Sequence, residues 1–333
     1  MSPAGSDRNP GTKAAPWQTI GKALASLSAG QTALVRGGAY RENLVASRRG
    51  TATAPITVKA YPGERPVLRP ASGGVPLEIA SGAAYLRFQG LVIEGATGSS
   101  TTNVYASGSA NHIELSDCEI RNSQRQGFFS ERTTRAIQIL RCYIHDNGGH
   151  GPDNLDHNVY VEGRDHVIAR NVITGARNGW GIQLYPSSGN VLLSSNTIVG
   201  SRHGIVVGGQ GSDGTSDALV VNNIIAFNER DGISSYWGDG SSGSCNLVES
   251  NLGYRNGSKD FDGSEGGLTF RHNVVANPRF IGGSRGASQF RLRPGSPAQR
   301  RALRAYAPLF DFAGRRRADA ARPALGAFEA DLH

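Results

Sequence analysis

A short phrase of alternating apolar and polar residues returns eight times between about Ala84 and Pro278. Each copy ends in Gly, Cys or Asn followed by another apolar pair, as in YLRFQGLVI, IQILRCYI and VLLSSNTI. Alternation with a period of two, rich in β-branched residues and closed by Asn or Gly, predicts short strands joined by tight turns. The closing residues stand 22 to 29 residues apart and are Gly90, Cys118, Cys142, Asn171, Asn196, Asn223, Asn251 and Asn273.

This spacing predicts a solenoid in which each repeat is one coil of three short strands, because helical solenoids need longer units with a 3.6-residue period. Parallel coils lie about 4.8 Å apart, so equivalent residues superimpose from coil to coil. We therefore expect the repeated Asn residues to form an internal hydrogen-bonded ladder. Cys118 and Cys142 stand on consecutive rungs, where we expect stacked buried thiols in preference to a disulfide.

The segments on either side of the repeats complete a single domain over residues 1–333. The segment PWQTIGKALASLSA predicts a short amphipathic helix over residues 16–29, with Ile20, Leu24 and Leu27 on one face. Such a helix would cap the first coil, whose core and strand edges are otherwise exposed. We expect the coils to occupy about residues 31–278, followed by an irregular tail over residues 279–333 that packs along the stack.

The net charge of +8 over 333 residues is concentrated in the tail, where 11 Arg and four acidic residues give +7. The coils are thus almost neutral, and the overall charge lends little support to an acidic partner. The basic residues are not interleaved with aromatics in a known nucleic-acid-binding module, so we expect no nucleic-acid partner. No apolar run approaches the roughly 18 residues that would span a membrane. We expect a monomer with no membrane association.

Several segments resemble bacterial secreted right-handed parallel β-helix proteins of the pectate-lyase-like superfamily. They are the opening GSDRNPGTKAAPWQTIGKAL, the coil LVRGGAYREN, the repeated N-x-I rungs and the close FRLRPGSPAQ…DFAGRRR…ALGAFE. The resemblance implies an all-β, single-stranded, right-handed parallel β-helix that is secreted, although the start of this sequence has no apolar signal-peptide stretch. The superfamily includes pectate, alginate and chondroitin lyases, uronan epimerases and polygalacturonases, so the resemblance leaves the activity open.

The residues after each turn predict a candidate binding face. If Phe128, Val159, Ile182, Ile205 and Ile233 point inward, the alternate residues of these strands point outward. One predicted outer column is Phe129, Tyr160, Gln183, Val206 and Ser234, and the next is Glu131, Glu162, Tyr185, Gly208 and Tyr236. The turns before these strands supply Arg125 and Gln126, Asp156 and His157, Gly179 and Trp180, Arg202 and His203, and Arg230 and Asp231. Aromatic rings stack on sugar faces and Arg pairs with uronate carboxylates, so this face would suit an anionic polysaccharide.

The chemistry of β-elimination assigns roles on this face. The reaction needs a cation for the C5 carboxylate, a base for the C5 proton and an acid for the leaving oxygen. Arg202 or Arg230 would hold the carboxylate, His157 or His203 would be the base, and Tyr160 or Tyr185 the acid. We therefore predict catalytic residues His157, Tyr160, Arg202 and His203. The predicted substrate-binding residues are Arg177, Trp180, Gln183, Tyr185, Arg230, Tyr236, Trp237, Glu131 and Glu162.

The longest coil spacing, between Cys142 and Asn171, contains the loop HDNGGHGPDNLDH. Its Asp153 and Asp156 offer hard oxygen ligands for Ca²⁺, the one cofactor that the sequence suggests. An acid/base cluster of His157 with Tyr160 and a polar hydrogen-bonded loop are competing interpretations, and zinc is disfavoured because the His residues lack a ligand spacing. Further along, Lys259-Asp260-Phe261 faintly resembles the lysine-bearing stretch of one pectate lyase group, without that group's aspartate cluster.

A polysaccharide lyase that acts on an acidic, uronate-containing polymer is the preferred function, with two classes of alternative. Glu131 and Glu162 stand in one column on adjacent coils, at a separation that could suit a glycoside hydrolase. An epimerase would begin with the same proton abstraction as a lyase, so the sequence does not separate the two. The same aromatic and Arg residues could also serve a non-catalytic polysaccharide-binding protein.

Overall fold

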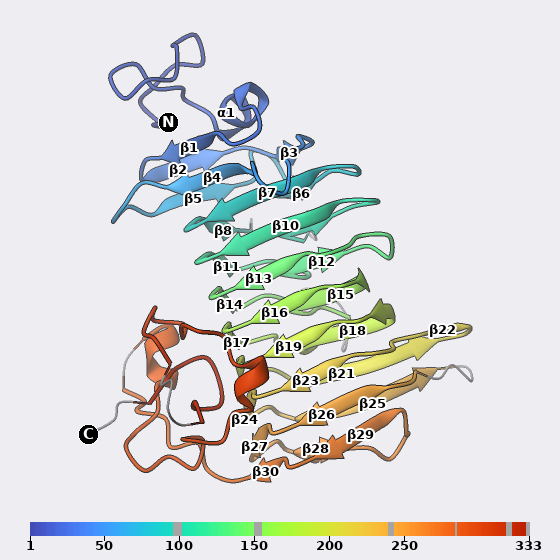
Figure 1. The fold of residues 1–333 in the computed structure, drawn as a ribbon. Helices are drawn as coiled ribbons and strands as arrows, with labels where there is room; N and C mark the ends of the chain where they lie inside the picture. Colours follow the sequence, from blue (N-terminus) through green and yellow to red (C-terminus); the bar gives the residue numbers. More distant parts are fainter. Residues whose placement is uncertain (96–101, 150–154, 239–242, 284, 318–321, 331–333) are drawn as a thin grey trace.

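The computed structural model describes residues 1–95, 102–149, 155–238, 243–283, 285–317 and 322–330. The predicted parallel β-helix is confirmed: the chain winds through three parallel sheets, each of which takes one strand from successive coils (Figure 1). Sheet 1 consists of β1 (Thr32–Val35), β4 (Ile56–Ala60), β7 (Ala84–Gln89), β10 (Asn111–Ser116), β13 (Gln138–Leu140), β16 (Val167–Ala169), β19 (Leu192–Ser194), β23 (Leu219–Val221), β26 (Asn246–Glu249) and β29 (Leu268–Arg271).

The other two sheets follow the same order along the stack. Sheet 2 consists of β2 (Gly38–Arg41), β5 (Pro66–Arg69), β8 (Val92–Glu94), β11 (Glu119–Arg121), β14 (Tyr143–His145), β17 (Val172–Thr174), β20 (Thr197–Val199), β24 (Ile224–Ala226), β27 (Leu252–Tyr254) and β30 (Val274–Val275). Sheet 3 consists of β3 (Leu44–Ala46), β6 (Leu77–Ile79), β9 (Val104–Ala106), β12 (Phe128–Ser130), β15 (Val159–Arg164), β18 (Trp180–Gly189), β21 (His203–Gln210), β25 (Ile233–Gly238) and β28 (Phe261–Asp262). A short β22 (Asp213–Gly214) pairs with β21 in the antiparallel sense.

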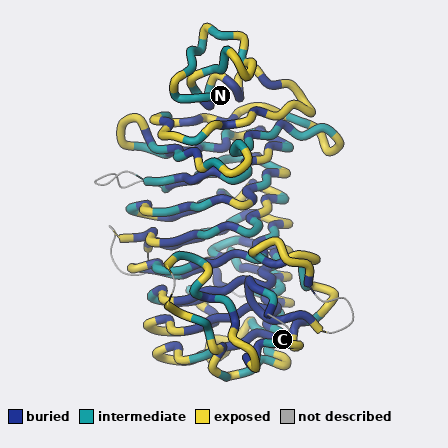
Figure 2. Tube along the Cα trace, turned by 90° about the vertical axis from the view of Figure 1, so that its left-hand side faces the viewer, coloured by how far each residue is buried: buried dark blue, intermediate teal, exposed yellow. Residues whose placement is uncertain are grey.

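The core runs through the interior of the coils from end to end (Figure 2). Inward positions carry Ile, Leu, Val and Phe because a strand with one face in a continuous core needs an apolar residue at every second position. Phe88 and Ile113, for example, are fully buried on neighbouring coils of sheet 1. None of the helices in the described ranges is long and apolar enough to cross a membrane.

The predicted Asn ladder is confirmed. The Oδ1 atom of Asn196 accepts from the backbone N and the Nδ2 of Asn171, each at 3.0 Å. The same two bonds join Asn223 to Asn196, Asn251 to Asn223 and Asn273 to Asn251, at 2.8 to 3.0 Å. Each buried amide is thus satisfied by its neighbours, which is what permits a polar column inside the core.

The two cysteines on the ladder are free and buried, so the expectation of stacked thiols holds. The bend before the ladder is made by non-glycine residues in the left-handed region: Asp117, Arg141, Arg170, Ser195 and Asn222 have φ between 54° and 61°. This conformation costs free energy for a side chain with a Cβ. Its recurrence at one place in successive coils indicates that the stacking of the coils holds the backbone in that shape.

The capping helix is shorter than predicted: α1 spans Ile20–Ser26. The predicted start at residue 16 is wrong because Thr19 is extended and caps the helix, its Oγ1 accepting from the N of Lys22 at 3.1 Å. Glu42 adds a carboxylate that accepts from the N of Ile20 and of Gly21 at 2.7 and 2.8 Å. The helix places Ile20 and Leu24 over the first coil.

The tail beyond β30 contains two short 3₁₀ helices, η1 (Ala287–Phe290) and η2 (Arg304–Tyr306). It lies beside sheet 2 (Figure 1), where Phe290 and Phe328 pack with Val172 and Val199. The backbone N of Ala327 donates to Oγ1 of Thr197 at 2.9 Å, which ties the tail to β20. The tail therefore covers part of sheet 2 and leaves the outer face of sheet 3 open.

Candidate functional site

The strand register on the outer face of sheet 3 is the one that the sequence predicted. Phe128, Val159, Ile182, Ile205 and Ile233 pair along the stack and are 0 to 1% exposed. The predicted outward column also pairs from coil to coil, and it consists of Phe129, Tyr160, Gln183, Val206 and Ser234. Side chains that are distant in sequence therefore share one surface.

A second column is formed by residues at the start of these strands and in the loops just before them. Trp180 pairs with His203, and the two rings stack with centroids 4.6 Å apart at 23°. On the next coil Asp231 Oδ2 lies 3.4 Å from His203 Nδ1. On the coil after that, the N of Gly232 donates to the carbonyl of Lys259 at 2.7 Å, which places Lys259 next to Asp231. Indole, imidazole, carboxylate and ammonium groups thus follow one another along the stack.

These columns border a cavity of about 460 Å³, which we call the sheet-3 groove. Five of the predicted site residues line it: Trp180, Gln183, Tyr185, His203 and Tyr236. The remaining lining comes from Leu155, Val206, Asp231, Ser234, Ser235, Asp262 and Glu265. A groove of this size, with aromatic walls and several convergent polar groups, has the usual character of a ligand site.

His203 is a buried polar residue of the groove lining. It is 7% exposed, and burial lowers the pKa of its imidazole. Asp231 raises that pKa, whereas the positive charges of Arg202 and Arg230 lower it further. The imidazole is therefore neutral near pH 7 and sits in the field of two guanidinium groups.

His157, which the sequence predicted as a possible catalytic base, is buried and does not line the groove. It is 2% exposed, and burial lowers its pKa to about 3. Its Nδ1 accepts from the backbone N of Trp180 at 3.1 Å, and its ring meets Tyr160 edge-on at 5.4 Å. His157 lies behind the lining of the sheet-3 groove, where it supports the Trp180 strand.

Tyr160, Tyr185 and Tyr236 differ in their place on this face. Burial, and the neighbouring charge of Glu162, raise the pKa of Tyr160. The hydroxyl of Tyr185 donates to Oε1 of Gln210 at 2.8 Å, and its ring lies 6.1 Å from that of Tyr236. Tyr185 and Tyr236 border the groove, whereas Tyr160 does not belong to its lining.

Three carboxylates of the lining were not among the predicted site residues. Besides Asp231, Asp262 accepts from Nζ of Lys259 at 2.9 Å, and Glu265 accepts from the N of Trp237 at 3.0 Å. Asp262 could have been found from the register, because it continues the outward column beyond Ser234. No repeat signal marks Glu265, which lies beyond the end of β28.

Glu131 and Glu162 lie next to the groove without lining it. Burial raises the pKa of Glu162 to about 7, and Glu131 and Asp213 raise it while Arg132 lowers it. Glu131 accepts from the hydroxyl of Tyr105 and, at 2.6 Å, from the N of Gly108.

The other predicted residues fall outside the groove lining. They are Arg177, Arg202, Arg230 and Trp237. Trp237 packs against the solenoid core, and its Nε1 donates to the carbonyl of Gly266 at 3.0 Å. Arg202 and Arg230 stand in the turns next to His203 and Asp231, where their charge reaches the imidazole.

The predicted calcium ligands are only partly within the described ranges. Asp153 lies outside them, and Asp156 is 1% exposed. In the part of the chain that the structure describes, no three His, Cys, Asp or Glu side chains come together as a metal-binding group. The calcium site therefore stays a prediction, because Asp153 is part of it.

The groove lining also holds polar atoms that the protein does not satisfy. Nε1 of Trp180, Oε1 of Gln183 and Oγ of Ser235 have no hydrogen-bond partner among the described residues. Native proteins rarely leave such groups unpaired, and those that remain often belong to functional sites.

Comparison with known proteins places this fold among carbohydrate-active β-helices. A family profile described as Pel9A-like, right handed beta helix region, matches residues 1–273. The structure of pectate lyase Pel9A is similar over 99% of this chain and 96% of its own, with a TM-score of 0.63 at 14% identity. The GH136 lacto-N-biosidase from Eubacterium ramulus has a TM-score of 0.61 at 16% identity and covers 82% of this chain and 63% of its own.

An alginate lyase from Paenibacillus is a third structural relative, with a TM-score of 0.53 at 16% identity over 77% of this chain and 96% of its own. In sequence, the uncharacterized protein YwoF of Bacillus subtilis is 35% identical over 130 residues, or 36% of this chain. Pectate lyase PEL9 of Emericella nidulans is 41% identical over 70 residues, or 20% of this chain. The matches cover 28% and 17% of these two relatives, so the chain spans less than a third of either.

Proposed function

Because the chain belongs to the Pel9A-like right-handed β-helix family, we propose that it is a polysaccharide lyase that cleaves a uronate-containing polymer in the sheet-3 groove. The observation that carries this proposal is the neutral imidazole of His203, held on the groove floor beside Asp231 and in the positive field of Arg202 and Arg230. A base that is neutral yet surrounded by cations suits proton abstraction next to a carboxylate.

His203 takes the C5 proton of the uronate in this scheme. Its Nδ1 lies 3.4 Å from Oδ2 of Asp231, and in this proposal Nε2 is the atom that takes the proton. The electron pair of the C5–H bond forms the C4–C5 double bond as the C4–O bond breaks. Asp231 stabilises the imidazolium that results, as a carboxylate does for a catalytic imidazole elsewhere.

Arg230 neutralises the substrate carboxylate in this scheme. It is exposed, stands in the turn beside Asp231, and lowers the pKa of His203 by its charge. A guanidinium group pairs with a carboxylate through two parallel hydrogen bonds, which makes the neighbouring C–H more acidic. Arg202 adds to the same field from the preceding coil.

Tyr185 supplies the proton for the leaving oxygen. Its hydroxyl is in the groove and already acts as a hydrogen-bond donor, to Gln210. Trp180 and Tyr236 present rings to the same groove, where they would stack on sugar residues on either side of the bond that breaks. The three lining carboxylates already accept or face partners in the protein, so their charge is partly offset.

Two measurements on the same samples test this function. The protein is incubated with polygalacturonate, alginate and chondroitin sulfate, with and without added Ca²⁺, and with a neutral xylan as control. We expect new ultraviolet absorbance from the unsaturated product to rise together with reducing ends on one acidic polymer. Absence of absorbance on all three acidic polymers would contradict the proposal.

A glycoside hydrolase is the second candidate, favoured by the pKa of Glu162, which burial raises to about 7. A carboxyl group that is protonated near neutral pH can act as a general acid on a glycosidic oxygen. In this case reducing ends would appear without ultraviolet absorbance, and Glu162→Gln would abolish them. For a lyase, the same substitution should leave the rate within about threefold, because Glu162 lies outside the groove lining.

A further inference from the structure

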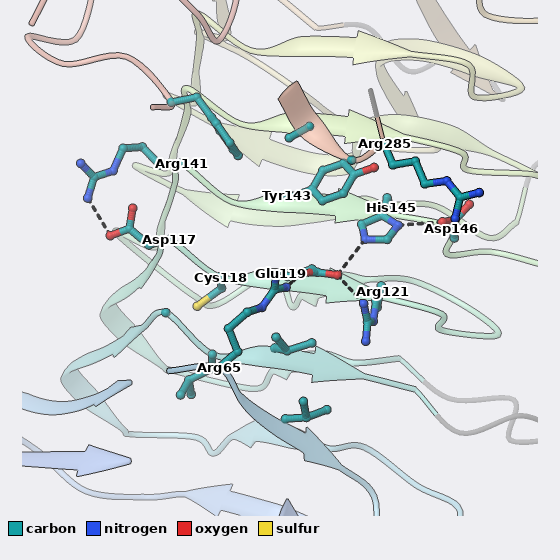
Figure 3. Close-up of a pocket in the computed structure, with 17 residues that line it drawn as sticks. Arg65, Asp117, Cys118, Glu119, Arg121, Arg141, Tyr143, His145, Asp146 and Arg285 are labelled. Carbon is teal, nitrogen blue, oxygen red and sulfur yellow. Dashed lines mark hydrogen bonds and ion pairs between the residues drawn. The ribbon is translucent and has the colours of Figure 1, made fainter. Parts of the chain in front are cut away.

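A second and larger pocket lies on sheet 2, on a different face from the sheet-3 groove. It has a volume of about 900 Å³ and is bordered by strands β5, β8, β11 and β14 and by the tail near Gly286 and Phe312 (Figure 3). Ligand sites commonly measure about 300 to 1,000 Å³. We call this cavity the sheet-2 pocket.

Four arginines line the pocket, and they differ in whether a carboxylate of the protein pairs with the guanidinium group. Arg121 donates to Glu119 at 2.6 Å and to Glu94 at 2.7 Å, and Arg65 also pairs with Glu119. Arg141 donates to Asp117 at 2.6 Å, while its Nε is buried without a hydrogen-bond partner among the described residues. Arg285 comes from the tail and is exposed, and in the described structure no side-chain contact neutralises its guanidinium group. The guanidinium group of Arg285 is therefore the exposed cationic donor that this pocket offers to a ligand.

An aromatic platform stands between these arginines. The ring of Tyr143 stacks on that of His145, with centroids 4.0 Å apart at 21°. His145 lies between two carboxylates, 2.7 Å from Asp146 and 3.2 Å from Glu119, which fixes the orientation of its ring. Figure 3 shows this stack with Arg285 on one side and the Arg121–Glu119 pair on the other.

The lining also contains three carboxylates, which pair with Arg141, Arg121 and His145, and a set of apolar residues. Val67, Leu91 and Val92 come from sheet 2 and the turn before it, and Ala287 and Phe312 come from the tail. A ligand that fits must therefore offer an apolar face together with negative charge. A short acidic saccharide has both, because the C–H faces of its sugar rings pack on apolar and aromatic side chains and its carboxylates pair with arginine forks.

We propose that the sheet-2 pocket is a separate binding site for an acidic oligosaccharide, held by Arg285 and Arg141 against the Tyr143 platform. Because Arg285 belongs to the tail and Arg141 to the coils, occupation would join the tail to sheet 2. The site performs no chemistry in this proposal: the imidazole of His145 is held between carboxylates. It stands independently of the activity proposed for the sheet-3 groove.

Isothermal titration with trigalacturonate tests the site, and the neutral trisaccharide maltotriose serves as a control ligand. The titration uses the His203→Ala variant, in which we expect the probe to survive uncleaved. The expected stoichiometry is two trigalacturonate molecules per chain, one in each cavity, with no comparable binding of maltotriose in the sheet-2 pocket. Absence of any trigalacturonate site that Arg285→Glu removes, or equal binding of maltotriose at that site, would overturn the proposal.

Charge variants of Arg285 identify the second site. Added to His203→Ala, Arg285→Glu should abolish one of the two binding events, and Arg285→Lys should weaken it about tenfold because the fork is lost while the charge remains. Arg300→Glu is the matched control, since Arg300 is an exposed tail residue outside the pocket lining. Two unchanged sites in Arg285→Glu would refute the assignment. In the wild-type background, Arg285→Glu should leave turnover unchanged, which separates this site from the sheet-3 groove.

Discussion

In the sheet-3 groove, the ring of His203 stacks on that of Trp180 with centroids 4.6 Å apart, and one carboxylate lies beside the imidazole. In the sheet-2 pocket, the ring of His145 stacks on that of Tyr143 with centroids 4.0 Å apart, and the imidazole lies between two carboxylates. The two cavities thus use the same side-chain types in different hydrogen-bonding arrangements. His145 has a carboxylate beside each ring nitrogen, at 2.7 and 3.2 Å. The comparison shows that similar ring pairs on two faces of the solenoid differ in the number of carboxylates that hold the imidazole, and this difference is what the following variants test.

The largest expected effect separates the two imidazoles by turnover. His203→Ala should lower kcat on the responsive polymer by about 10²- to 10⁴-fold, the usual contribution of a general base. His145→Ala should leave kcat within about threefold, because this ring lies in the other cavity. Initial rates of ultraviolet absorbance check both, with circular dichroism to establish that each variant is folded.

Lys259→Ala sharpens the same prediction. The ammonium group of Lys259 pairs with Asp262 at 2.9 Å, so we expect it to support the groove and its loss to lower kcat about tenfold. If Lys259→Ala abolished turnover while His203→Ala did not, the base would be the lysine, and the assignment to His203 would be wrong.

Acid unfolding should be the next largest effect. The pKa of His157 is lowered to about 3 by burial, so between pH 6.5 and 3 the unfolded chain binds a proton that the folded chain does not. Stability at this site is fully present above pH 6.5 and should fall by about 1.4 kcal/mol for each pH unit below it. Urea unfolding at pH 7 and pH 5 measures the loss.

Substitution of one histidine near each cavity tests which imidazole causes the loss of stability at low pH. His157→Gln should flatten the dependence of unfolding free energy on pH, although it will lower stability at pH 7. His145→Gln should flatten it less, because Asp146 opposes the effect of burial on the pKa of His145. Equal slopes in wild type and His157→Gln would show that another group governs acid unfolding.

The smallest expected effect compares two arginines. Arg230→Ala should lower kcat/KM about tenfold, because a carboxylate partner is lost from the substrate. Arg121→Ala removes a guanidinium group from the sheet-2 pocket and should leave kcat/KM unchanged, whatever it does to stability. Steady-state kinetics across substrate concentration distinguishes these outcomes, and a similar loss in both variants would mean that overall charge, not position, attracts the polymer.

The repeat by itself predicted much of this molecule. Asn171, Asn196, Asn223, Asn251 and Asn273 sit at a spacing that only stacked coils can bring together, and their ladder follows from hydrogen-bond satisfaction in a buried column. The same spacing and the period of two predicted that Ile182, Ile205 and Ile233 point inward. These features depend on local alternation and on one repeated distance, both of which are written in the sequence.

The sequence could not predict which side chains of a column line the groove and which are buried behind it. Register brought His157 and His203 to one column, but only the packing of Trp180 between them buries His157 behind the groove and leaves His203 in its lining. Likewise Trp237 belongs to a predicted face yet turns onto the core, because the last coils offer it the carbonyl of Gly266. Turn conformation and ring packing decide such cases, and neither follows a period.

The sequence therefore determined the parallel β-helix, its Asn ladder and the columns of its outer face. Tertiary structure alone decided that the tail lies beside sheet 2, because its contacts to Thr197 and Asn222 join residues more than 80 positions apart without any repeat to signal them. Other residues of the tail, Arg285, Gly286, Ala287 and Phe312, complete the sheet-2 pocket, and no described residue of the tail lines the sheet-3 groove. The repeat predicts the strands and the ladder because these recur in every coil. The sheet-2 pocket depends on the tail, which follows the last repeat and folds back over sheet 2 without any periodic signal.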